Sequence, residues 1–211
     1  MKKVLIVDDH AVVRDGLKRI LDEHQPGETV FAEATNGPEA LQLVQQQNWD
    51  AVVLDLSLGS ASGLEVLKEL KQIRPKLPVL ILSMHSEEQY ARRAFKAGAA
   101  GYLTKDSPRA ELQKALSRIV EGRRYVSPDL AEALISDIER GAGRAPHEAL
   151  SDREFQVMCL IASGKTLSEI AETLALSDKT ISTYRARVLE KMAMRTNAEL
   201  THYAIHTKLV E

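Results

Sequence analysis

The first half of the chain alternates short apolar runs with stretches of helical periodicity. Continuous apolar runs, typical of parallel strands buried on both faces, occur at residues 4–7, 51–54, 78–82 and 100–103, with a weaker strand candidate at 29–34. Between these runs, apolar residues recur every three or four positions, which predicts helices that cover a sheet with one face. Five strands that alternate with five helices predict an α/β domain over residues 1–121, built on a doubly wound, five-stranded parallel sheet.

The remainder of the chain contains no convincing strand pattern. Residues 122–146 are expected to form a linker with a short helix that starts at Ser127-Pro128. Residues 147–211 show helical spacing throughout. Within them, a short helix at 168–174, a tight turn and a longer helix from Asp178 follow the pattern of a helix-turn-helix. We therefore expect a small all-α domain after the linker.

Composition narrows the class of protein. The 211 residues include 28 lysines and arginines against 30 aspartates and glutamates. This near balance excludes a protein held to nucleic acid by bulk positive charge. The single cysteine, Cys159, cannot form an internal disulfide, and the sequence shows no membrane or export segment. We expect a cytoplasmic protein without a membrane partner.

Reactive side chains follow the predicted strands at their carboxyl ends, where doubly wound sheets bind ligands. The first strand ends in Asp8 and Asp9, the third in Asp55 and the fourth in Ser83, and the fifth leads to Lys105. Three carboxylates in one cleft repel one another unless a hard cation such as Mg²⁺ lies between them. One carboxylate could then act as a nucleophile toward a phosphoryl group, while Mg²⁺ and the lysine neutralise the transferring oxygens and the serine hydroxyl senses the product.

Each of these residues also has an ordinary structural interpretation. A single aspartate at a strand end commonly caps a helix, as Asp8 or Asp9 would for a helix starting near Ala11. Five positions that share one rim favour the functional interpretation. Two alternatives remain open. One is an Mg²⁺-dependent phosphohydrolase, although Ser57 occupies the place of that class's second catalytic aspartate; the other is a regulator with a vestigial pocket that acts independently of phosphorylation.

Four segments together resemble the receiver domain of two-component response regulators over the whole of residues 1–121: Val4–Asp9, Val53–Leu56, Leu82–Ser83 and Gly101–Lys105. The resemblance implies a flavodoxin-like fold in which Asp55 accepts a phosphoryl group and Lys105 pairs with it. It further implies a switch pair, Ser83 with Tyr102. The implied Mg²⁺ site consists of Asp8, Asp9, Asp55 and the backbone carbonyl of Ser57.

The longer helix of the predicted helix-turn-helix has two different faces. The inward face is expected to comprise Ile181, Tyr184, Val188 and Met192, and the outward face Lys179, Ser182, Thr183, Ala186 and Arg187. Residues 179–195 contain five basic residues against Glu190, whereas residues 147–211 as a whole contain 8 basic and 9 acidic residues. A solvated helix face alone could carry such charge. The short outward residues favour a helix that approaches base edges while its longer basic side chains reach phosphates.

The segments Leu150–Glu154, Glu169–Ala171 and Leu176–Tyr184 resemble the LuxR-type DNA-binding domain. Joined to a receiver, this domain makes the chain similar to the NarL/FixJ family of response regulators. The resemblance implies phosphorylation by a sensor histidine kinase and sequence-specific binding of double-stranded DNA as a homodimer, with a final helix at 198–208 in the dimer contact. It does not imply a turnover enzyme. The expected DNA contacts are Lys179, Thr180, Ser182, Thr183, Tyr184, Arg185, Ala186, Arg187 and Lys191.

The chain departs from these family patterns at three positions. Gly59 stands where receivers usually have proline, which loosens the loop without removing a chemical group. In the second domain, Ser182 stands where many members carry lysine and Tyr184 where many carry histidine. The docking mode of the helix is therefore better specified by the resemblance than the individual base contacts.

Overall fold

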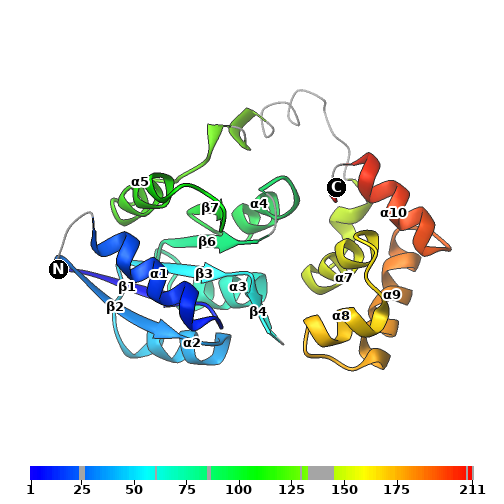
Figure 1. Cartoon of the computed structure of the whole chain (residues 1–211), viewed down its shortest axis with the longest axis horizontal. Helices are drawn as coiled ribbons and strands as arrows, with labels where there is room; N and C mark the ends of the chain where they lie inside the picture. The colour runs from blue at the N-terminus through cyan, green and yellow to red at the C-terminus, as the bar shows by residue number, and fades with distance from the viewer. Residues whose placement is uncertain are drawn as a thin grey trace. The chain divides into compact units, whose positions relative to one another are not determined.

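The computed structural model describes residues 1–23, 27–59, 61–84, 87–128, 130–132, 145–207 and 209–210. The chain divides into two compact units, Met1–Ala131 and Glu132–Glu211 (Figure 1). The first unit thus continues past residue 121, where the receiver was predicted to end. Most of the predicted linker lies at residues 133–144, outside the described residues.

A five-stranded sheet forms the centre of the first unit. Its strands, all parallel, are β1 (Lys2–Val7), β2 (Thr29–Ala34), β3 (Ala51–Asp55), β6 (Val79–Ser83) and β7 (Gly101–Thr104). They are ordered β2-β1-β3-β6-β7, so the strand order reverses between β1 and β3. The predicted doubly wound parallel sheet is confirmed. Because the strands are parallel, their carboxyl ends all lie at one edge of the sheet.

Helices cover both faces of this sheet (Figure 1). The five helices are α1 (Ala11–Asp22), α2 (Gly37–Gln46), α3 (Gly63–Ile73), α4 (Glu87–Lys96) and α5 (Arg109–Val120). Helix α1 packs with α5, whereas α3 packs with α2 and α4. The apolar face that α1 and α5 share, including Leu17, Leu112 and Ile119, contacts alternate residues of the central strands such as Ile6 and Val53. Because helices cover both faces of the sheet, residues that point to either face are apolar, and the strands appear in the sequence as continuous apolar runs.

The loop after β3 contains structure that the hydrophobic pattern did not predict. Two short strands, β4 (Ser57–Leu58) and β5 (Ala61–Ser62), pair antiparallel. Gly59 lies between them with φ 56°, in the left-handed region that glycine adopts without strain. Proline, with φ fixed near −65°, cannot adopt this conformation. Glycine in place of proline at position 59 therefore allows a different loop conformation, in addition to making the loop more flexible.

A second unpredicted feature attaches the start of the predicted linker to the first unit. Tyr125 forms an isolated parallel bridge with Gly101 at the free edge of β7, and its N–H donates to the Ala100 carbonyl at 2.9 Å. The Tyr125 ring is buried, and its hydroxyl donates to Glu111 Oε2 of α5 at 2.6 Å. Further on, the Leu130 N–H donates to Ser127 Oγ at 3.2 Å, as expected for a helix that starts there.

The second unit is all-α in its described residues, as predicted. A 3₁₀ turn, η1 (Pro146–Ala149), precedes α7 (Asp152–Ala162), α8 (Leu167–Thr173), α9 (Asp178–Lys191) and α10 (Asn197–His206). Each of the four α-helices begins after a hydroxyl residue whose side chain accepts an N–H of the first turn: Ser151, Thr166, Ser177 and Thr196. Among the described residues of the whole chain, no helix has the length and apolarity needed to cross a membrane.

Candidate functional sites

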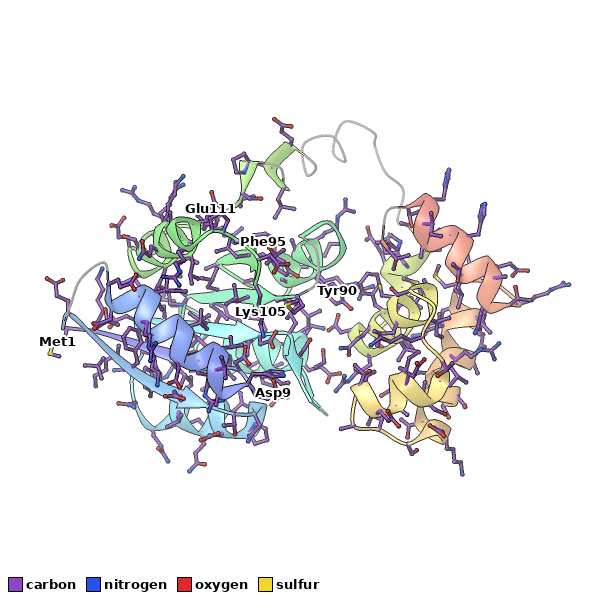
Figure 2. All side chains as sticks on the ribbon, in the orientation of Figure 1. Met1, Asp9, Tyr90, Phe95, Lys105 and Glu111 are labelled. Atoms are coloured by element: carbon purple, nitrogen blue, oxygen red, sulfur yellow. The ribbon has the colours of Figure 1, made fainter. Side chains whose placement is uncertain are left out.

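The acidic residues predicted to share one rim do meet in the structure. Lys105, which follows β7, donates from Nζ to Asp8 Oδ2 and to Asp55 Oδ2, both at 2.7 Å. Asp8 and Asp55 are buried, and the Lys105 side chain is 13% exposed. One ammonium thus joins the ends of β1, β3 and β7. Asp9, the third carboxylate, lies at the same edge of the sheet as Lys105 (Figure 2).

His10 also belongs to this pocket, although no role was predicted for it. Its Nδ1 lies 2.7 Å from Asp9 Oδ1 and 3.3 Å from Asp8 Oδ1. Its backbone N–H donates to Asp8 Oδ1 at 2.8 Å. Potential ligand atoms of Asp8, Asp9 and His10 lie within 4.8 Å of one another, so these three residues could hold a metal ion. Its position directly after two consecutive aspartates was the available signal.

Burial and ion pairing act against each other in this pocket. Burial raises the pKa of Asp55 and outweighs the opposing effect of its hydrogen bond and charge interaction with Lys105. Burial alone would lower the pKa of Lys105, but its bonds to Asp55 and Asp8 raise that pKa on balance. The ionised Asp55 is therefore held at a cost in free energy. A further positive charge in the pocket would reduce that cost.

The oxygen donors of the pocket suit a hard divalent cation. Asp55 Oδ1 is buried and accepts no hydrogen bond within the described part of the chain. An unpartnered buried carboxylate oxygen is costly unless a cation or another ligand satisfies it. Asp8 and Asp9 supply further carboxylates, and the half-buried Ser57 lies two residues beyond Asp55. The carboxylate oxygens gathered in this pocket are the kind of ligand that Mg²⁺ prefers.

The two predicted switch residues lie inside the first unit. Ser83 ends β6, where it is aligned with Thr104, and Tyr102 is aligned with Ile81 in the next strand. Both side chains are completely buried. The Lys105 N–H donates to the Ser83 carbonyl at 2.8 Å, which connects the end of β6 to the residue that holds Asp8 and Asp55. Asp55 itself is aligned with Leu82, the neighbour of Ser83.

The second unit contains the predicted helix-turn-helix. The Thr166 and Glu169 side chains form a reciprocal capping box at the start of α8. Ala175, with φ 50°, turns the chain, and the Ser177 side chain accepts the Thr180 N–H to begin α9. These local contacts set where α9 starts, and hence which residues face outward.

The outward face of α9 is as predicted. Its members Lys179, Ser182, Thr183, Ala186 and Arg187 are all exposed. On the inward face, Ile181, Val188 and Met192 are buried, whereas Tyr184 is only half-buried, like Thr180. The side chains of α9 that could reach a DNA duplex therefore combine short and basic residues on one surface.

Two basic residues expected to contact DNA have partners within the second unit. Arg185, half-buried, donates from Nε to Asn197 Oδ1 of α10 at 2.7 Å. Lys191 Nζ lies 2.6 Å from Glu154 Oε2, and the Glu154 side chain is only 4% exposed. Both residues thus stabilise the packing of α9 against its neighbours. Helical periodicity alone could not reveal these partners, because both lie on other helices.

The fold and the acidic pocket of the first unit are those of a receiver domain. Residues 4–117 match the family model described as the response regulator receiver domain. Residues 148–204 match the model described as bacterial regulatory proteins, luxR family. The chain therefore belongs to the NarL/FixJ family of two-component response regulators, which control transcription in a phosphorylation-dependent manner.

Two known proteins match nearly the whole chain, and a third matches about two thirds of it. The response regulator UvrY of Escherichia coli K12 is 36% identical over 206 residues, 97% of this chain and 94% of UvrY. A crystal structure of a LuxR-family response regulator from Aurantimonas is 41% identical with a TM-score of 0.59, and covers 66% of this chain and 98% of its own. A structure of RcsB from Salmonella enterica serovar Typhimurium, bound to a promoter in the presence of phosphomimetic BeF₃⁻, has a TM-score of 0.63. It is 24% identical and covers 96% of this chain and 97% of its own, so it shows likeness of fold alone.

Proposed function

We propose that Asp55 is the phosphoacceptor of this response regulator. A sensor histidine kinase would supply a phosphohistidine. A carboxylate oxygen of Asp55 attacks phosphorus, the P–N bond breaks, and the imidazole leaves with its bonding pair and takes up a proton. The observation that carries the proposal is the Asp55 carboxylate itself: one oxygen is held by Lys105, and the other is buried without a hydrogen bond among the described residues.

Lys105 and the neighbouring carboxylates have distinct parts in this proposal. Lys105 would follow the negative charge from the Asp55 oxygens onto the phosphoryl oxygens, and so stabilise the product. Asp8, Asp9, Asp55 and the Ser57 carbonyl would hold Mg²⁺, which supplies the positive charge that the transferring oxygens need. His10, whose Nδ1 lies 2.7 Å from Asp9 Oδ1, would lie beside this cation site. No turnover on small phosphate esters is expected, because Ser57 offers no second carboxylate.

The output would be a change in DNA binding. Phosphorylation would favour the state in which Ser83 and Tyr102 stay inside the domain, and both are buried in this structure. We propose that this state promotes a homodimer on double-stranded DNA. The contacts would come first from the exposed Lys179, Ser182, Thr183, Ala186 and Arg187, with Thr180 and Tyr184 at the edge of that face. Arg185 and Lys191 would act mainly by holding α9 in place.

The test begins with an intact-mass spectrum of the full chain after incubation with acetyl phosphate and Mg²⁺. We expect one phosphoryl adduct that is absent without Mg²⁺ and absent in Asp55→Asn. Duplexes selected from a randomised pool by the phosphorylated chain should then bind it more tightly than they bind Asp55→Asn. An adduct that persists in Asp55→Asn would contradict the assignment of Asp55. No adduct under any condition would favour a vestigial pocket.

A further inference from the structure

Arg14, at the end of the first turn of α1, connects the acidic pocket to the edge of the sheet. Its Nε donates to Glu33 Oε2 of β2 at 2.6 Å, and its Nη1 donates to the backbone carbonyl of Asp8 at 2.9 Å. The Arg14 side chain is 12% exposed. Lys18, one turn later, pairs with the same Glu33 carboxylate and with Asp15. Two cations therefore share one carboxylate, and Arg14 also bonds to the Asp8 carbonyl.

The carbonyl that Arg14 holds belongs to the peptide between the two consecutive aspartates. Asp8 is fixed by bonds on every side. Its N–H donates to the Ala34 carbonyl at 3.1 Å, Oδ1 accepts the His10 N–H, and Oδ2 accepts from Lys105. Asp9 is held far less firmly, because its side chain is 35% exposed and contacts the exposed His10 ring. The direction of the Asp9 carboxylate therefore depends on the orientation of the peptide that precedes it.

We propose that Arg14, itself oriented by Glu33, is a positioning residue for the divalent-cation site and acts through the Asp8 carbonyl on Asp9. The inference rests on the Mg²⁺ site proposed above. The planar guanidinium has donors in a fixed fork, so one group can bond to Glu33 and to the Asp8 carbonyl at once. While the Arg14 guanidinium makes both bonds, the peptide between Asp8 and Asp9 cannot rotate without breaking its bond to this largely buried group. The carboxylate of Asp9 is thereby kept at the rim before the metal arrives, which lowers the cost of binding.

The effect of this positioning role on Mg²⁺ affinity is opposite in sign to the effect of charge repulsion. A guanidinium near a cation site repels the cation, so loss of its charge alone would strengthen Mg²⁺ binding. Loss of the positioning bond weakens binding instead. Lys18→Met provides the matched control, because it removes a positive charge from the same Glu33 carboxylate and leaves the bond from Arg14 to the Asp8 carbonyl in place.

The experiment measures Mg²⁺ binding to the full chain by calorimetry, without any phosphodonor. We expect Arg14→Met to weaken Mg²⁺ binding by about tenfold, as loss of a bond that orients a ligand commonly does. Arg14→Lys, which keeps the charge but not the fork, should also bind Mg²⁺ weakly, and Lys18→Met should bind Mg²⁺ at least as tightly as the natural chain does. Glu33→Gln leaves Arg14 less firmly held and should give an intermediate loss. It also provides a second variant if Arg14→Met folds poorly.

A double-mutant cycle identifies the route of the effect. If Arg14 acts through Asp9, Arg14→Met should cause no further loss of Mg²⁺ affinity in an Asp9→Asn background. Equal or tighter Mg²⁺ binding by Arg14→Met would overturn the proposal, as would full rescue by Arg14→Lys or an undiminished loss in the Asp9→Asn background. If the natural chain bound no Mg²⁺ at all, the Mg²⁺ site itself would be wrong, a result distinct from any difference between variants.

Discussion

The acidic pocket and the outward face of α9 are organised by different means. The pocket draws its side chains from the ends of several strands, and its charges are buried and bonded to one another through Lys105. The face of α9 comes from one helix, and its members are exposed. Substitutions in the pocket should therefore be coupled, since each changes the environment of the others. Substitutions on the exposed face should act nearly independently.

The difference between the buried pocket and the exposed face also gives different environments to residues of the same type. Lys105, Lys179 and Lys191 are all lysines in predicted functional positions. Lys105 joins two buried carboxylates, Lys191 is bonded to one, and Lys179 is exposed. A gradient of effects on stability and binding should follow from these three environments.

The largest effect is expected at Lys105. Lys105→Met leaves the buried Asp8 and Asp55 carboxylates without their shared cation, and should lower the free energy of unfolding of the first unit by about 3 kcal/mol. Urea unfolding measures this loss of stability. The control is Lys114→Met, which replaces an exposed lysine of α5. Added Mg²⁺ should restore more stability to this variant than to the natural chain. Equal loss in both variants would show that the pocket charges are already solvated.

A smaller loss is expected at Lys191. Lys191→Met removes the cation that pairs with the covered Glu154 carboxylate, which keeps its bond from the Ser151 N–H, and should destabilise the second unit by about 1–2 kcal/mol. Burial alone would raise the pKa of Glu154, but its bonds from Lys191 and Ser151 lower it on balance. The stabilisation from this lowered pKa is present above the pKa of unfolded glutamate and is lost as pH falls through the folded pKa. Thermal unfolding over an acid pH series should show this loss in the natural chain and a weaker one in Lys191→Met.

Substitution of Lys179 should affect DNA binding and leave stability unchanged. Lys179→Met removes an exposed charge, so unfolding should match that of the natural chain. Its affinity for a mixed-sequence duplex should fall, and the slope of log affinity against log salt should decrease in magnitude by about 0.9, the value for one phosphate contact. Arg187→Met provides a parallel case on the same face. An unchanged salt slope in both variants would argue against this face as the one that meets the phosphates.

The smallest effect is expected from neutralising Asp55, the proposed phosphoacceptor. Because burial raises the pKa of Asp55, Asp55→Asn should unfold at a slightly higher temperature than the natural chain at neutral pH. A raised folded pKa gives stability that is complete below the unfolded pKa and is lost as pH rises through the folded pKa. The advantage of Asp55→Asn should therefore shrink as the solution is acidified. A constant or reversed difference across the pH series would mean that Lys105 compensates Asp55 fully.

Much of the fold and of the pocket could be predicted because the relevant signals are local or periodic. The strand at 29–34 and the start of α9 at Asp178 lie where the sequence placed them. The convergence of Asp8, Asp55 and Lys105 followed from one general property of parallel sheets, that strand ends share an edge. The β4–β5 hairpin and the attachment of Tyr125 to β7 carry no periodic pattern, so they could not be predicted, and the only signal for His10 was its position after two aspartates.

The sequence by itself determined the order of the elements, the two-unit organisation and the types of side chain available at each strand end. These follow from hydrophobic periodicity and from capping residues such as Ser151, Thr166 and Ser177, whose partners lie within one turn. Only the tertiary structure decided which charges are paired. Lys191 finds Glu154, and Arg14 finds both Glu33 and the Asp8 carbonyl, on elements distant in the chain. A charged side chain reaches several ångströms in any direction, and its partner is set by packing that no local pattern encodes.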